Sequence, residues 1–173
     1  MSVRRIELCR NPERIALIKP SALGDVAHTL PVLSALRSRF PAAHIAWVIN
    51  RSYAPILEGH PHLDEIIPFD RAAMRKSWLG GSLEFGRFLR HLRQTRFDMV
   101  IDLQGLFRTG LMALATGASL RIGLASAREG ARIGYTHRID DRMDVRHAVD
   151  RYWRVVEALG DAPTEKRFLV PVQ

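Results

Sequence analysis

Apolar positions follow two different periods along this chain. Short apolar runs of about five residues alternate with longer segments in which apolar residues recur every three or four positions. The first pattern is typical of buried parallel strands, and the second is typical of helices that cover a sheet. We expect strands over 14–19, 44–49, 65–69, 98–102 and 120–124, with helices ending at Arg39, over 53–58, from Ser82 onward, over 106–116 and over 146–159. The alternation predicts an α/β fold, a parallel sheet with helices on both faces.

Four features complicate this pattern. Pro31 lies inside the first predicted helix, so the helix either kinks there or ends near His28 and restarts with Thr29 as its cap. Pro68 interrupts the third strand. The segment 70–82 is basic and rich in glycine, which indicates a mobile loop, and 125–144 is irregular and charged.

The composition indicates an ordinary globular domain. The chain has 173 residues, enough for one domain with a sizeable core, and is 47% hydrophobic and 25% charged. No apolar run reaches about 18 residues, and no apolar run follows the first two arginines, so we expect neither a membrane-spanning helix nor a signal peptide. The single Cys9 excludes an internal disulfide and a cysteine metal site.

The charge is strongly positive and unevenly distributed. The formal net charge is +8, and the segment 71–96 holds seven lysines and arginines against one acid, Glu84. Such an excess indicates an anionic partner, which could be a nucleic acid, an anionic lipid or a phosphorylated substrate. A solvated helix face accounts for some of these residues.

The chain is organised around the stretch 15–28. Four apolar residues, Ile15–Ile18, form a buried strand that Pro20 and Ser21 end. Gly24 lets the backbone approach a ligand closely, and Asp25 follows at the carboxyl end of the strand, where open α/β sheets bind ligands. A carboxylate there can accept a proton from a substrate hydroxyl. The alternative is that Asp25 only stabilises the helix N-terminus.

No cofactor or metal is expected. The chain lacks the glycine-rich motifs that bind nucleotide phosphates. No His or Cys pair has metal-ligand spacing on a predicted element, and His60 and His62 lie in a predicted loop.

Five segments of the chain form a recognisable series of motifs. They are Lys19–Pro31 (KPSALGDVAHTLP), Val100–Leu106 (VIDLQGL), Arg121–Gly123 (RIG), Ala127–Gly130 (AREG) and His147–Arg151 (HAVDR). In order and spacing these segments together resemble the glycosyltransferase family 9 heptosyltransferases. The resemblance extends over about residues 14–170, and the first two motifs are specific in combination.

The resemblance implies the amino-terminal half of a GT-B enzyme, whose two Rossmann-like domains face each other across a cleft. We therefore expect residues 1–13 to be an amino-terminal extension, residues 14–165 to form the acceptor-binding domain, and residues 166–173 to begin the interdomain linker. The resemblance implies that the donor-binding domain is absent from this chain. We expect that the chain by itself does not complete the reaction.

The resemblance also implies a reaction and partners. The family transfers heptose from ADP-heptose to a Kdo residue of Kdo2-lipid A in lipopolysaccharide core biosynthesis, with inversion at the anomeric carbon. Asp25 matches the proposed general base. The implied location is cytoplasmic, on the anionic cytoplasmic face of the inner membrane, and no nucleic-acid partner is expected.

The acceptor carries carboxylates and phosphates, for which arginine and lysine are suited. The expected acceptor-binding residues are Lys19, Ser21, Gly24, His28, Arg75, Lys76, Gln104, Arg108 and Arg128. The chain departs from some members of the family just before Arg75, where Ala72 and Ala73 replace a pair of arginines. A second hypothesis from a different class is a non-catalytic basic module that binds anionic lipid or nucleic acid.

Overall fold

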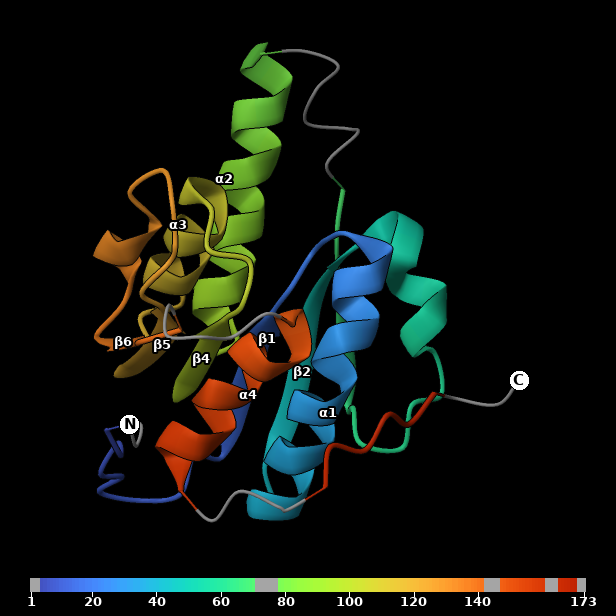
Figure 1. The fold of residues 1–173 in the computed structure, drawn as a ribbon. Coiled ribbons are helices and arrows are strands. Elements are labelled where there is room, and N and C mark those ends of the chain that lie inside the picture. The colour runs from blue at the N-terminus through green and yellow to red at the C-terminus, as the bar shows by residue number, and fades with distance from the viewer. Residues whose placement is uncertain (1–3, 71–77, 142–146, 161–164, 171–173) are drawn as a thin grey trace.

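One parallel sheet organises the domain. The computed structural model describes residues 4–70, 78–141, 147–160 and 165–170, and within them six parallel strands lie in the order β3-β2-β1-β4-β5-β6 (Figure 1). The strands are β1 (Arg14–Ile18), β2 (His44–Asn50), β3 (Glu65–Phe69), β4 (Met99–Asp102), β5 (Leu120–Leu124) and β6 (His137–Ile139). The predicted α/β fold with a parallel sheet is confirmed.

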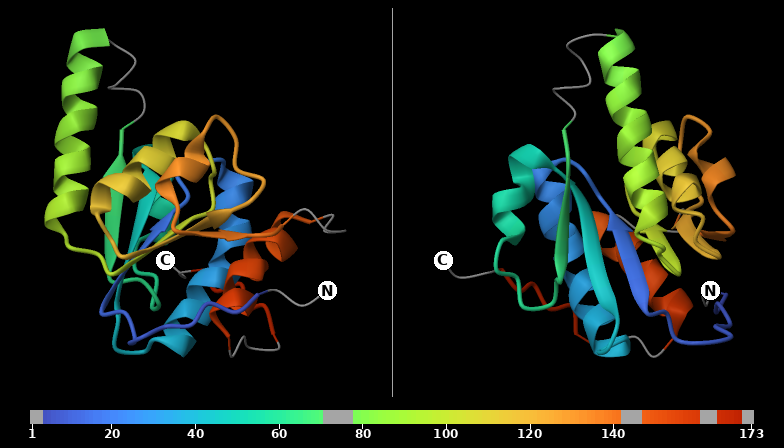
Figure 2. Two further views of the ribbon diagram at one scale, coloured as in Figure 1. Left: turned by 90° about the vertical axis from the view of Figure 1, so that its left-hand side faces the viewer. Right: turned by 180° about the vertical axis from the view of Figure 1, so that it is seen from behind.

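Alternate side chains of each strand enter two separate cores. Ile15 and Leu17 of β1 pack on one face of the sheet, whereas Ala16 and Ile18 pack on the other. Helices α1 (Leu23–Arg39) and α4 (Ala148–Leu159) cover the first face together with the 3-10 helix η1 (Arg51–Leu57), and helices α2 (Trp78–Gln94) and α3 (Phe107–Thr116) cover the second with the 3-10 helix η3 (Ala131–Gly134) (Figure 2). Burial on both faces explains why the strands are continuous apolar runs.

Helix α1 continues through its proline. It runs unbroken from Leu23 to Arg39, which excludes the alternative in which the helix ends near His28 and restarts at Thr29. Every residue from Thr29 to Leu36 is buried, Pro31 included. Burial of this apolar segment offsets the roughly 3 kcal/mol that an interior proline costs a helix.

The segments 70–82 and 125–144 contain regular elements that the sequence analysis missed. Helix α2 begins at Trp78, four residues before Ser82, so the expected loop ends earlier; the remainder of that loop, 71–77, lies outside the described residues. The second segment contains η3 and β6, a three-residue strand with only Ile139 buried. A single apolar residue gives no detectable strand pattern. Pro68 is tolerated because β3 is an edge strand.

The segment before β1 packs on the domain. Ile6 is buried, and its amide donates to Ala158 O at the end of α4 (2.7 Å). The amides of Glu13 and Arg14 both donate to Asp98 Oδ2 at 2.9 Å. Ile6 and Pro12 are therefore buried against the domain, while most of residues 4–13 stay exposed.

Helix α3 and η3 cross with their backbones in contact at Gly110. A Cβ added to Gly110 would lie 2.5 Å from Ala131 O and 2.7 Å from Ala131 Cα. Backbone atoms cannot move aside as a flexible side chain can. We expect Gly110→Ala to lower the free energy of unfolding by about 1–3 kcal/mol, measured by urea denaturation.

Gly86 provides the matched control. It lies in α2, and an added Cβ there would meet nothing within 4 Å. Gly86→Ala should raise the free energy of unfolding by about 0.5–1 kcal/mol through helix propensity alone. Equal stabilisation by both substitutions would contradict the close crossing of α3 and η3.

Candidate functional site at the carboxyl edge of the sheet

The site lies where the strand order reverses direction. After β1 the chain builds the sheet outward through β2 and β3, then returns to place β4 on the other side of β1. Open α/β sheets bind ligands in the crevice at this switch point, outside the carboxyl ends of the strands. The loops that follow β1 and β4 are joined here, because the Ser21 amide donates to Gln104 Oε1 (3.3 Å) and the Leu103 amide donates to Ile18 O (3.1 Å).

Asp25 stands in the first turn of α1, directly above the end of β1. Its side chain is 38% exposed, and Lys19 Nζ lies 3.3 Å from its Oδ2 atom. The Lys19 ammonium also donates to Leu103 O at 3.3 Å, and its side chain is only 3% exposed. Lys19 therefore lies beneath the carboxylate and holds it, while Asp25 itself remains open to solvent.

Tyr152 of α4 completes this group. Lys19 Nζ lies 4.9 Å from the centroid of its buried ring, within the range of a cation–π contact. Its phenol donates a hydrogen bond to the Asp25 carboxylate, and burial, followed by the charge of Asp25, raises the pKa of Tyr152 above its usual value. Sequence analysis did not single out Tyr152. Its position between Val149 and Val156 at helical spacing was the available signal, but that signal indicates burial rather than contact with Asp25.

The ionisation of Lys19 depends on its carboxylate partner. Burial lowers the pKa of Lys19 from that of an ordinary lysine, and the charge and hydrogen bond of Asp25 oppose this change.

A second buried carboxylate shapes the loop after β4. Asp102 accepts hydrogen bonds from the amides of Gln104 (2.9 Å) and Gly105 (3.1 Å) and from the hydroxyl of Tyr135 (2.6 Å). Burial raises the pKa of Asp102, while these hydrogen bonds act in the opposite direction. Gly105 has φ +68°, and an added Cβ would lie 3.1 Å from Ala127. These contacts fix the backbone that presents Gln104 to Ser21.

A third buried carboxylate ties the ends of β5 and β6 to α4. Asp141 Oδ2 accepts from Arg151 Nε (3.2 Å) and from a terminal nitrogen of the same guanidinium (3.1 Å), and Asp141 Oδ1 accepts from the Ser126 amide (2.9 Å). Arg151 precedes Tyr152 in α4. The cluster therefore anchors the turn of α4 that reaches the Lys19–Asp25 pair.

The structure brings some of the predicted site residues together. Lys19, Ser21 and Gln104 lie with Asp25 in the group described above. Gly24 is exposed, and a Cβ added to it would meet nothing within 4 Å, so the space beside the start of α1 is open. His28 follows one turn later in α1 and is partly buried, with Nδ1 lacking a hydrogen-bond partner among the described residues.

The remaining predicted residues have their described contacts with other segments or lie outside the described residues. Arg108 points toward α2 and β3, where its guanidinium carbon lies 5.9 Å from the ring centroid of Phe69 and 6.0 Å from that of Phe85. Arg128 has an exposed side chain, and its amide donates to Gly105 O (2.8 Å), which places its loop beside the loop after β4. Arg75 and Lys76 lie outside the described residues.

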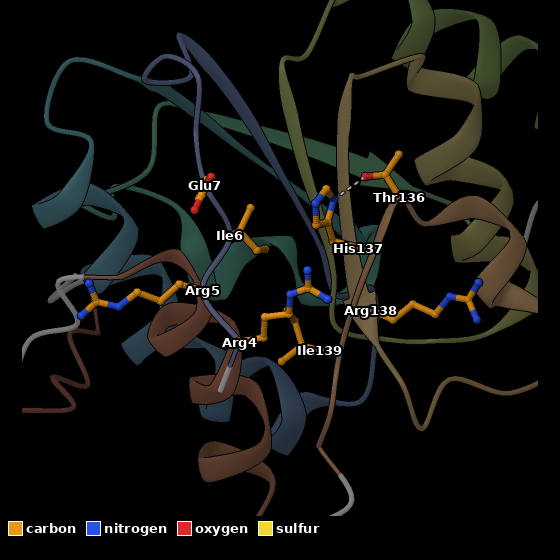
Figure 3. A pocket seen from close by; sticks show the side chains of 8 residues that line it. All are labelled: Arg4, Arg5, Ile6, Glu7, Thr136, His137, Arg138 and Ile139. Carbon is orange, nitrogen blue, oxygen red and sulfur yellow. Dashed lines mark hydrogen bonds between the residues drawn. The ribbon is translucent and has the colours of Figure 1, made fainter. Parts of the chain in front are cut away.

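A large surface cavity lies elsewhere. It has a volume of about 530 Å³ and opens between residues 4–7 and β6, at the outer edge of the sheet (Figure 3). Its walls are the exposed side chains of Arg4, Glu7 and Arg138 among others, and Arg138 points away from Arg4 in Figure 3. The cavity shares no residue with the group around Asp25.

Comparison with known proteins decides the family. Residues 85–170 match the model described as glycosyltransferase family 9 (heptosyltransferase). Lipopolysaccharide heptosyltransferase 1 of Pseudomonas aeruginosa is 34% identical over 155 residues, which are 87% of this chain and 43% of that protein. The same enzyme of Escherichia coli is 30% identical over 142 residues, 80% of this chain and 44% of the relative. The chain belongs to glycosyltransferase family 9.

Solved structures of family 9 proteins share the fold. A glycosyltransferase of family 9 from Veillonella parvula superposes with a TM-score of 0.81 at 28% identity, over 98% of this chain and 48% of that one. The Escherichia coli heptosyltransferase WaaC with ADP-2-deoxy-2-fluoro heptose superposes with a TM-score of 0.75 at 28% identity, over 90% of this chain and 51% of that one. The Rossmann-like fold predicted from the resemblance is confirmed. This chain spans about half the length of the relatives that it matches.

The contact between Lys19 and Asp25 can be tested without an activity assay. Asp25→Asn should lower the pKa of Lys19 further, because it removes the negative charge that opposes the effect of burial. The measurement is an NMR titration of the Lys19 side chain. Glu58→Gln, an exposed change at the end of η1, should leave the pKa of Lys19 as it is. An unchanged pKa in Asp25→Asn would mean that the two side chains do not interact in solution.

Proposed function

We propose that this chain is the acceptor-binding half of an inverting heptosyltransferase of lipopolysaccharide core biosynthesis. Its donor would be ADP-heptose and its acceptor a Kdo residue of Kdo2-lipid A. In this proposal residues 14–165 form the acceptor-binding domain, and residues 166–173 lead toward a donor-binding domain outside this chain. Family membership and the similarity to lipopolysaccharide heptosyltransferase 1 support the substrates.

The proposed chemistry is a single displacement. The acceptor hydroxyl oxygen bonds to the anomeric carbon of heptose while the bond from that carbon to the phosphate oxygen breaks, which releases ADP and inverts the configuration. The hydroxyl proton passes to Asp25. Bond formation makes the hydroxyl strongly acidic, so the proton can transfer late, and positioning of the carboxylate contributes as much as its proton affinity.

The observation that carries this proposal is the half-exposed carboxylate of Asp25 at the switch point of the sheet. Buried Lys19 and Tyr152 hold it from below, and open space adjoins it at Gly24. In a module that only binds anions, a fixed carboxylate that faces solvent would weaken binding, because its negative charge would repel the anionic ligand. The arrangement therefore favours catalysis over the non-catalytic alternative.

Cationic side chains near the carboxyl edge would bind the acidic acceptor. The exposed guanidinium of Arg128 lies on the loop that adjoins Gly105, and arginine is suited to bidentate contacts with carboxylates and phosphates. We propose that Arg128 contacts the acceptor, that Arg75 and Lys76 assist it, and that the enzyme acts at the cytoplasmic face of the inner membrane.

Removal of the carboxylate should strongly reduce turnover. The chain is combined with the donor-binding half of the Pseudomonas aeruginosa relative, and transfer of heptose from ADP-heptose to Kdo2-lipid A is followed by mass spectrometry. Asp25→Ala should lower kcat by roughly 10²–10⁴-fold, the usual contribution of a general base, with little change in the KM of the acceptor. Glu58→Gln serves as the control. Turnover like that of the unaltered chain in Asp25→Ala would exclude the base role.

Removal of the exposed guanidinium should weaken acceptor binding. Arg128→Ala should raise the KM for Kdo2-lipid A about tenfold or more, because a charge-assisted hydrogen bond is lost, and should leave the KM for ADP-heptose unchanged. Arg128→Lys, which keeps the charge but not the planar fork, should be intermediate. If only the KM for ADP-heptose changed, Arg128 would contribute to donor binding and not to acceptor binding.

A further inference from the structure

Two buried polar side chains stand behind the Asp25 carboxylate, and no step of the proposed displacement uses either of them. The side chain of Lys19 is 3% exposed, and its Nζ lies 3.3 Å from Asp25 Oδ2. Tyr152 is 4% exposed, and its phenol donates a hydrogen bond to the same carboxylate. Burial of an ammonium and of a hydroxyl is unfavourable unless both are paired. Here both pairings converge on one carboxylate that is itself open to solvent.

The two contacts reach Asp25 from separate elements. Lys19 follows directly after β1, and its ammonium is also fixed by Leu103 O, 3.3 Å away in the loop after β4. Tyr152 comes from α4, with its ring centroid 4.9 Å from Lys19 Nζ. A half-exposed aspartate can otherwise rotate among several side-chain rotamers. Two donors that are fixed on different elements restrict the carboxylate to an orientation that satisfies both.

Helix α4 is itself held in place beside Tyr152. The preceding residue, Arg151, donates to Asp141 Oδ2 from Nε (3.2 Å) and from a terminal nitrogen (3.1 Å). The side chain of Asp141 is fully buried, and its Oδ1 accepts from the Ser126 amide (2.9 Å). Helix α4 also packs along α1, the helix that carries Asp25. The phenol therefore has a fixed position, to which the carboxylate must conform.

We propose that Lys19 and Tyr152 are positioning residues for the proposed base: they hold Asp25 from its buried side, so that its open side faces the acceptor hydroxyl, and neither touches the acceptor. This inference rests on the proposed function. It deepens that function by giving Lys19 a role through Asp25, in place of the acceptor contact that the resemblance implies. A carboxylate that already has the right orientation accepts the proton without first rotating, so both residues contribute to kcat rather than to binding.

The phenol–carboxylate contact can be tested by NMR on the chain alone. The hydroxyl proton of Tyr152 should give a slowly exchanging downfield resonance, because it is buried and bound to a charged acceptor. Tyr152→Phe should remove this resonance and thereby assign it. Asp25→Asn should move it upfield, because the acceptor becomes neutral. Absence of such a resonance, or a resonance that does not respond to Asp25→Asn, would overturn the proposal.

Tyr152→Phe is the mildest kinetic test, because it removes the hydroxyl and keeps the ring beside Lys19. In the heptose-transfer assay described above, it should lower kcat about tenfold, the effect of one hydrogen bond to a charged group. The KM values for Kdo2-lipid A and ADP-heptose should not change. Ser34→Ala is the control, since it removes a buried hydroxyl farther along α1, and it should leave kcat unchanged.

Lys19→Met tests the second positioning residue. It keeps an unbranched side chain in the buried space and removes the charge, so kcat should fall by roughly 10²-fold with the KM for Kdo2-lipid A unchanged. Circular dichroism should show that the variant is folded, and Tyr152→Phe decides the proposal if it is not. A rise in the KM for Kdo2-lipid A with kcat unchanged would return Lys19 to acceptor binding and overturn its positioning role.

A double variant separates positioning from independent action. Tyr152→Phe should cause no further loss of kcat in Asp25→Ala, because the phenol then has no carboxylate to hold. An additive loss would overturn the proposal, as would an unchanged kcat in Tyr152→Phe alone, which is the result expected if the phenol only stabilises the packing of α4. In both cases the base role of Asp25 would stand. If Asp25→Ala turned over like the unaltered chain, the proposed function would fall and this inference with it.

Discussion

The ion pair between Lys19 and Asp25 is the contact on which the carboxyl edge of the sheet depends. A buried ammonium is unfavourable unless its charge is compensated, and three different segments supply that compensation. Asp25 comes from α1, the Leu103 carbonyl comes from the loop after β4, and the ring of Tyr152 comes from α4. The same contact that satisfies Lys19 therefore joins the two strands at the switch point to the helix that covers them.

The strands and helices could be predicted from the sequence wherever their apolar residues recur with a clear period. Burial on both faces makes the first five strands apolar runs, and the amphipathic helices between them require a parallel sheet. The failures have local causes. Strand β6 contains one buried residue, α2 begins through two glycines that favour other conformations, and Pro31 is accommodated because the surrounding residues of α1 are buried. The spacing of apolar residues along the sequence does not reveal any of these three outcomes.

From the residues alone, the site could be predicted only for side chains that come directly after a strand, at the carboxyl edge of the sheet. Asp25 was singled out because it follows β1, at the edge where parallel strands bring their carboxyl ends together, whereas Ser21 and Gln104 were named through the family resemblance. Tyr152 could not be assigned, because its contact with Lys19 joins residues far apart in the sequence and the helical pattern of α4 indicates only burial. The direction of Arg108 was equally hidden, since its guanidinium lies over aromatic rings of β3 and α2 that are far from it in the sequence.

The unbroken helix α1 has a consequence for how such a carboxylate could operate. Its first turn carries Asp25, and the same helix is buried from Thr29 to Leu36. The side chain is thus preorganised: its position is determined when the chain folds, before any ligand arrives, and little reorganisation energy remains to be supplied on binding. Any adaptation to differently shaped acceptors would have to come from the rim of the crevice rather than from its floor.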